Sequence, residues 1–373
     1  MTVESAETFR AEPLRVVGPS RGSEPWPRDV EGFLRQLGGP AWISVPGRDA
    51  SRTRAVSTLL HGNEPSGVRA IHAWLRSGMR PAVDTVFFVG SVEAALVPPG
   101  FSHRTRFGHR DLNRCFLPPF PGPEGDLARE VLSRIRRLAP EALVDIHNTT
   151  GHTPAYGVGP RSDPARLTLT ALFARRFVES DLQLGALIEA VQDETPAIVV
   201  ECGMAGDPEP DRIAREGLAR FLAADSLGPA LRTGADAGSA PAISIVAHPV
   251  RVCLQPGLAL RYGRGPEAQA DLTVDAGIDR HNFEPIGPGA PIGWVRAGGP
   301  WPLVATRADG AEVSRELFQL REGRIEARTG FVPIMMTTDP EIAVQDCIFY
   351  AATSRDGAAP RDAADDGTKV VRV

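Results

Sequence analysis

Two histidines and a glutamate lie where apolar runs of this sequence end, and together they could bind a metal ion. His61 and Glu64 are three positions apart in the stretch LLHGNEP, and His147 ends the run ALVDIH. Two imidazoles and one carboxylate form a common catalytic zinc set, which leaves the fourth coordination position for water. A cation held in this way lowers the pKa of bound water towards about 7 and polarises a carbonyl group, which is hydrolytic chemistry at neutral pH.

Other polar residues could complete such a site. Glu201 follows the apolar run AIVV, and Asp145 precedes His147 by two positions, so on a strand it would share a face with His147 and could orient its imidazole. The stretch RTRFGHRDLNRCF at 104–116 is dense in arginine. A guanidinium can bind a carboxylate through two hydrogen bonds, although a solvated basic loop explains this composition equally well.

The four cysteines lack a C-x-x-C pair, which predicts reduced, mostly packed thiols in place of a disulfide framework or a thiolate zinc site. Any metal must therefore use histidine and carboxylate. Cys202 is adjacent to Glu201, but alternation along a strand would point it away from the glutamate, so we interpret it as a packed thiol and not as a nucleophile.

Short apolar runs alternate with helical patterns between about residues 40 and 225, which predicts an α/β fold with a mixed, mostly parallel sheet. The expected strands are 41–46, 55–60, 85–92, 142–147 and 197–201, and the expected helices are 67–76, 125–139 and 211–225. In open α/β sheets ligands bind outside the carboxyl ends of the strands. We therefore expect His61, His147 and Glu201 to converge there.

The amino-acid composition changes after residue 225, where Gly and Pro recur every few residues between short strand-like runs. We expect a hydrolase domain at 1–225, a smaller β-rich domain at 226–350 and a disordered tail at 351–373. A chain of 373 residues is long enough for two domains.

The overall composition excludes several classes of function. The formal net charge of -5 provides no field that would attract nucleic acid or anionic lipid, and no window has the roughly 18 continuous apolar residues of a membrane span. No secretory signal pattern opens the sequence, so we expect a cytoplasmic protein. A small-molecule substrate remains as the expected partner, and homo-oligomerisation is left open.

Four short motifs of this sequence resemble those of a known enzyme family. HGNE at 61–64, DLNR at 111–114, DIHNTT at 145–150 and VVECG at 199–203 follow the order and approximate spacing found in the succinylglutamate desuccinylase and aspartoacylase family, relatives of the zinc carboxypeptidases. The similar region covers about residues 50 to 220. Each motif is weak alone, but four in order are fairly specific.

The resemblance implies one zinc ion per chain and a role for each matching residue. Its ligands would be His61, Glu64 and His147; Glu201 would be the general base; Arg106 would polarise the scissile carbonyl; Asn113 and Arg114 would hold the carboxylate of the amino-acid product. Aspartoacylases also have an arginine about ten residues before the general base, where this chain has Val191. Aspartate-type specificity is therefore not implied.

The sequence thus predicts a zinc-dependent amidohydrolase that removes the acyl group from an N-acyl amino acid or a similar small amide. Two alternatives stay open. One is a zinc carboxypeptidase or peptide amidase that acts on longer peptides, and the other is a non-hydrolytic relative that binds a metal or another ligand.

Overall fold

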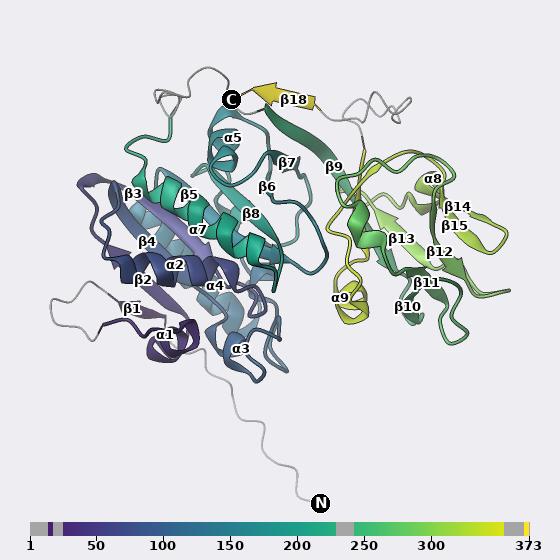
Figure 1. Cartoon of the computed structure of the whole chain (residues 1–373), viewed down its shortest axis with the longest axis horizontal. Helices are drawn as coiled ribbons and strands as arrows, with labels where there is room; N and C mark the ends of the chain where they lie inside the picture. The colour runs from purple at the N-terminus through teal and green to yellow at the C-terminus, as the bar shows by residue number, and fades with distance from the viewer. Residues whose placement is uncertain (1–13, 18–24, 229–241, 354–368, 373) are drawn as a thin grey trace, which may run out of the picture. The chain divides into compact units, whose positions relative to one another are not determined.

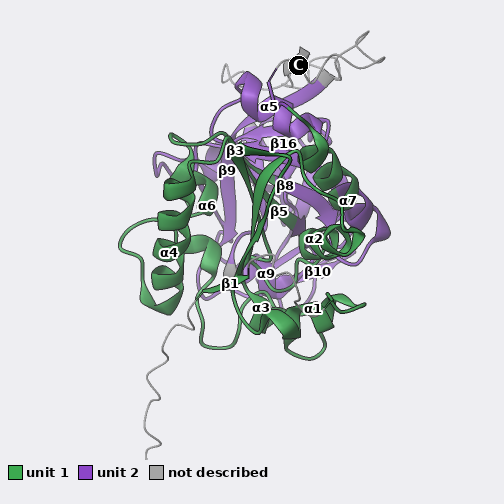
Figure 2. Cartoon of the chain, turned by 90° about the vertical axis from the view of Figure 1, so that its left-hand side faces the viewer, with its two compact units in different colours: residues 1–147, 184–199, 214–225 green, residues 148–183, 200–213, 226–373 purple. Residues whose placement is uncertain are grey.

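A computed structural model describes residues 14–17, 25–228, 242–353 and 369–372 of the chain (Figure 1). The chain divides into two compact units (Figure 2): unit 1 comprises residues 1–147, 184–199 and 214–225, and unit 2 comprises 148–183, 200–213 and 226–373. Strands β5 (Ala142–Thr149) and β8 (Ala197–Met204) and helix α7 (Pro208–Ala223) have residues in both. The domain boundaries expected at 225 and 350 stay a prediction.

Unit 1 contains a mixed sheet with the strand order β1-β2-β4-β3-β5. The pairs β1/β2, β3/β4 and β3/β5 are parallel, and β2/β4 is antiparallel. The remaining bounds are β1 Arg15–Val17, β2 Ala41–Val45, β3 Asp49–Thr58 and β4 Val83–Val89. The last five residues of β3 and all of β5 are buried, as expected for strands covered on both faces.

Helices cover both faces of this sheet. Viewed along its edge, α4 and α6 lie on one side of β3 and β5, and α2 and α7 lie on the other (Figure 2). The helices of unit 1 are α1 Val30–Leu37, α2 Ser66–Ser77, α3 Val92–Leu96, η1 Leu112–Arg114, α4 Gly122–Leu138 and α6 Leu187–Val191. In α2 the side chains of Val68, Ile71 and Trp74 are buried, whereas Leu138 at the end of α4 is exposed.

Unit 2 contains strands in the order β6-β7-β9-β17-β16, with β13 and β18 also paired to β9, and a second sheet in the order β10-β11-β12-β15-β14. Phe318, Phe331 and Phe349 pack against one another in the β-rich C-terminal part. The strands are β6 Tyr156–Gly159, β7 Arg176–Glu179, β9 Ala242–Leu254, β10 Leu260–Gly263, β11 Leu272–Asp275, β12 Pro291–Val295, β13 Leu303–Thr306, β14 Phe318–Arg321, β15 Arg324–Ala327, β16 Val332–Ile334, β17 Phe349–Thr353 and β18 Lys369–Arg372. The helices are α5 Pro164–Ala171, η3 Ile278–His281, α8 Ser314–Leu317 and α9 Pro340–Gln345.

The predicted fold class is confirmed: a mixed, mostly parallel α/β sheet is accompanied by a β-rich C-terminal sheet. Strand β17 continues to Thr353 and β18 lies at 369–372, within the range expected to be a tail; residues 354–368 and 373 lie outside the described residues. None of the helices in the described part of the chain has the length and apolar character needed to cross a bilayer.

Candidate metal centre

Strand register explains why distant residues meet in unit 1. Strand β3 ends at Thr58, whose partner on the parallel strand β5 is Ile146. His147 therefore lies one position beyond this pair, at the same sheet edge as the turn that follows β3. That turn carries His61 and Glu64 before α2 begins at Ser66.

The turn after β3 is held close to the sheet. The backbone N–H of Gly62 donates to the carbonyl of Arg104 at 2.9 Å. A Cβ added at Gly67, in the first turn of α2, would lie 2.0 Å from Thr58 Oγ1, so only glycine allows the helix to approach β3 this closely. The start of α2 consequently keeps Glu64 near the end of the strand.

Three buried side chains form the centre itself. Glu64 Oε1 lies 2.7 Å from His61 Nδ1, and Glu64 Oε2 lies 2.7 Å from His147 Nδ1. One ligand atom from each of the three residues lies within 4.8 Å of the others. All three residues are at most 4% exposed, so the arrangement is not a chance cluster of surface charges.

A carboxylate contacts the far side of each imidazole. Asp111 Oδ1 lies 3.0 Å from His61 Nε2, and Asp145 Oδ2 lies 2.9 Å from His147 Nε2. An ionised carboxylate can only accept, so Asp111 and Asp145 favour a proton on each Nε2, which leaves the lone pair of Nδ1 available to a metal ion. Without a metal ion, the same rule places a proton on each Nδ1 that faces Glu64. The expected contact between Asp145 and His147 is confirmed. Such carboxylate–histidine pairs fix the tautomer that binds a metal.

Mutual electrostatics shift several pKa values here. Burial alone would raise the pKa of Glu64, but His61 and His147 outweigh it and lower that pKa. Burial likewise opposes a low pKa for Asp111, which His61 and Arg104 nevertheless lower. Burial would lower the pKa of His147, but Asp145 and Glu64 raise it well above its ordinary value. The surroundings therefore favour positive charge at the centre.

The donor set fits a divalent cation. Glu64, Asp111 and Asp145 contribute three carboxylates and Arg104 contributes one guanidinium, so an excess of negative charge arises in a buried place once the imidazoles lose a proton to act as ligands. Burying that charge is costly unless a cation balances it. Imidazole nitrogen and carboxylate oxygen are ligands that zinc accepts.

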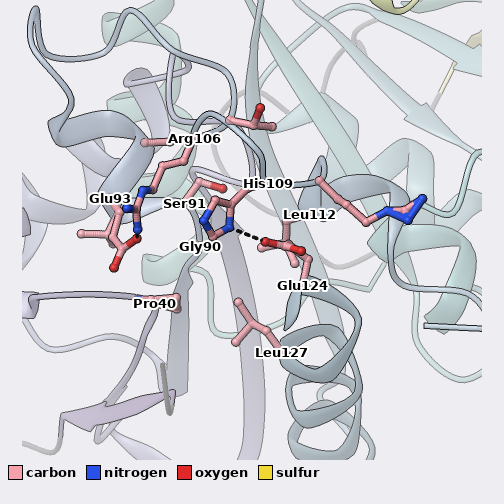
Figure 3. A pocket seen from close by; sticks show the side chains of 13 residues that line it. Pro40, Gly90, Ser91, Glu93, Arg106, His109, Leu112, Glu124 and Leu127 are labelled. Atoms are coloured by element: carbon pink, nitrogen blue, oxygen red, sulfur yellow. Dashed lines mark hydrogen bonds and ion pairs between the residues drawn. The ribbon is translucent and has the colours of Figure 1, made fainter. Parts of the chain in front are cut away.

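Arg106, predicted to polarise the carbonyl, forms an ion pair with Glu93 on α3. Figure 3 shows both side chains lining a pocket of about 100 Å³, where His109 Nδ1 lies 2.6 Å from Glu124 Oε1. Among the described interactions, Arg104 is the arginine that contacts Glu64: its Nη1 lies 3.6 Å from Glu64 Oε1. The catalytic role of Arg106 stays a prediction.

Asn113 and Arg114 lie in η1, directly after Asp111. The side-chain oxygen of Asn113 accepts from the backbone N–H of Leu187 at 3.0 Å, and Arg114 Nη1 donates to the carbonyl of Asn113 at 3.0 Å. Asn113 is buried and links η1 to the start of α6. The predicted binding of a substrate carboxylate by the two residues stays a prediction.

Glu201 is buried on β8 and belongs to unit 2, whereas the three metal-ligand candidates belong to unit 1. Its role as general base stays a prediction. The thiol of the neighbouring Cys202 is buried, and all four cysteines are free, as expected.

Asp111 and Arg104 contact the centre, but the sequence reasoning did not assign them to it. Asp111 could have been found, because it is the carboxylate of the DLNR motif. Arg104 had no such signal, because one arginine in an arginine-rich loop is not distinguished by its spacing.

Comparisons with known proteins agree with this picture. Residues 50–223 match the model of the succinylglutamate desuccinylase/aspartoacylase catalytic domain. This region of the chain is similar to the catalytic domain of that family. The match includes every motif quoted above and all of the candidate site residues. A search of curated proteins found no match.

One solved structure of the family is similar in fold, and a second alignment covers more of the chain. A succinylglutamate desuccinylase/aspartoacylase from Rhodobacter sphaeroides is 16% identical, with a TM-score of 0.51, and the alignment covers 83% of this chain and 87% of that one. Murine aminoacylase 3 is 18% identical, with a TM-score of 0.49, and the alignment covers 88% of this chain and 98% of that one.

Proposed function

We propose that the chain is a zinc-dependent amidohydrolase that hydrolyses the amide bond of an N-acyl amino acid or a similar small amide. The observation that carries the proposal is the buried group of His61, Glu64 and His147, in which both Nδ1 atoms face one carboxylate. The similarity of residues 50–223 to the succinylglutamate desuccinylase/aspartoacylase catalytic domain supports the same reaction.

The three side chains would hold one Zn²⁺, which when bound would polarise the amide carbonyl and acidify water. In the proposed reaction Glu201 accepts a proton from the attacking water and returns it to the nitrogen of the leaving amine as the C–N bond breaks. Asp111 and Asp145 keep the two imidazoles oriented throughout.

Two arginines and an asparagine would bind the substrate. Arg106 would leave Glu93 and stabilise the negative charge that develops on the carbonyl oxygen, an interaction that is strongest in the transition state. Arg114 and the amide nitrogen of Asn113 would bind the carboxylate of the amino acid. Val191 is fully buried, so the second-carboxylate clamp of aspartoacylases is not proposed at that position.

The test is to load the purified protein with zinc and to offer N-acetyl, N-succinyl and N-formyl amino acids, including basic and aromatic ones, while measuring freed amine. We expect turnover of at least one member, stoichiometric zinc, and loss of turnover in Glu201→Gln and His147→Ala. Preferential cleavage of oligopeptides would favour a carboxypeptidase or peptide amidase. Bound zinc without hydrolysis of either panel would favour a binding protein, and absence of zinc binding would refute the metal centre.

A further inference from the structure

Arg104 contacts the acidic groups of the candidate metal centre through its whole guanidinium. Nε and Nη2 donate to Asp111 Oδ2 at 3.0 and 2.8 Å, and Nη1 lies 3.6 Å from Glu64 Oε1. The side chains of Arg104 and Asp111 are only 18% and 19% exposed. Partial burial limits screening of this pair by solvent, so it differs from an ordinary surface ion pair.

Asp111 uses its two oxygens for different partners. Oδ2 accepts the two bonds from Arg104, whereas Oδ1 lies 3.0 Å from His61 Nε2 and accepts from the backbone N–H of Asn113 at 2.8 Å. Rotation of the carboxylate would break contacts on both sides. Two N–H groups of the planar guanidinium converge on Oδ2, and this fixes the orientation of the carboxylate in a way that a single point charge does not.

We propose that Arg104 is a positioning residue for the metal centre. Its hydrogen bonds fix Asp111, and Asp111 in turn holds His61 with Nδ1 towards Glu64, so that metal binding is strengthened. The proposal rests on the function proposed above, since it concerns the affinity of the same centre for its metal. It assigns to Arg104 a part that neither the motifs nor the family match gives it.

Two effects of Arg104 on a bound cation oppose each other. Its two hydrogen bonds to Asp111 order His61, which favours metal binding. Its positive charge near Glu64 repels a cation, which opposes metal binding. Arg104→Lys separates the two effects, because lysine keeps the positive charge but cannot make the paired guanidinium hydrogen bonds to Asp111. If positioning is the role of Arg104, this variant binds zinc more weakly although its charge is unchanged.

The experiment measures the zinc dissociation constant of the metal-free full-length chain by competition with a chromogenic chelator. We expect Arg104→Lys to weaken binding about tenfold, the lower end of the range for residues that support metal ligands. Arg134→Lys is the matched control, since Arg134 grips Glu130 through Nε and Nη2 with a similar exposure of 23% but contacts no metal-ligand candidate in the described interactions. The control variant should bind zinc like the wild type.

Two further measurements distinguish positioning from general damage. In an Asp111→Ala background, Arg104→Lys should cause no additional loss, because its effect passes through Asp111. The visible absorption of the Co²⁺-loaded protein should change in Arg104→Lys and not in Arg134→Lys. If Arg104→Lys does not fold, Arg104→Gln is titrated instead; since it also removes the repulsion, weaker binding supports positioning, and equal or tighter binding overturns it.

The outcomes separate this inference from the proposed function. If the wild-type protein binds no zinc, both the proposed hydrolase function and the positioning role of Arg104 are refuted. A wild type that binds zinc, together with a folded Arg104→Lys of equal affinity, overturns the positioning role alone and leaves the hydrolase proposal standing.

Discussion

Replacing Asp145 by asparagine should weaken zinc binding by about tenfold. Asp145 is fully buried, and its Oδ2 lies 2.9 Å from His147 Nε2. Asparagine keeps the size of the side chain but exchanges a charged acceptor for a neutral amide. A hydrogen bond to a charged group contributes about 1.5 to 3 kcal/mol and a neutral one about 0.5 to 1.5 kcal/mol. The difference of roughly 1 to 1.5 kcal/mol corresponds to about five- to tenfold in affinity.

The assay is a chelator competition at pH 7.5 on the metal-free protein, with bound zinc counted independently by elemental analysis. Asp84→Asn is the control, because Asp84 Oδ1 accepts from the backbone N–H of Gly47 at 2.7 Å and contacts no imidazole in the described interactions. Its zinc affinity should equal that of the wild type. Thermal unfolding of the metal-free variants shows whether each of them is folded.

Two results would refute this reasoning. One is a folded Asp145→Asn with a zinc dissociation constant within twofold of the wild type, which would mean that the charge of Asp145 does not act through His147. The other is an equal loss in Asp84→Asn, which would mean that a carboxylate elsewhere in this sheet has the same effect.

Two predictions concern the stability of unit 1. Glu141→Ala should lower the free energy of unfolding by about 2 to 3 kcal/mol in urea denaturation, because it leaves the fully buried Arg54, now bonded through Nε to Glu141 at 2.7 Å, without its counter-charge. Gly67→Ala should cost about 1 to 3 kcal/mol, since the new methyl group would overlap Thr58 Oγ1 and push α2 from β3.

Each of these has a control in the same unit. Glu130→Ala removes a more exposed carboxylate and should cost less than about 1 kcal/mol; an equal loss in both glutamate variants would contradict the buried-charge argument. Gly78→Ala places a methyl group in open space at a φ of +69° and should cost about 1 kcal/mol or less. If Gly67→Ala lowers the free energy of unfolding no more than Gly78→Ala does, the close packing of α2 on β3 does not require glycine at position 67.

The residues that could bind a metal, and the type of fold that carries them, were readable without coordinates. His61, Glu64 and His147 could be recognised because apolar runs end beside them, and the alternation of strands and helices indicates a sheet whose strand ends meet. These signals are local: each depends on residues within a few positions of one another. Strands β6 and β7, with four residues each, were too short to stand out as periodic runs.

Tertiary structure alone decided how the ligands are held. The register of Thr58 with Ile146 brings His147 to the turn after β3, and Asp111 reaches His61 from 50 positions away. The same folding of the 104–116 loop directs Arg104 to Asp111 and Arg106 to Glu93, although the two arginines are two positions apart. Which carboxylate each of the two arginines contacts depends on the path of the loop backbone, and periodicity and composition carry no information about that path.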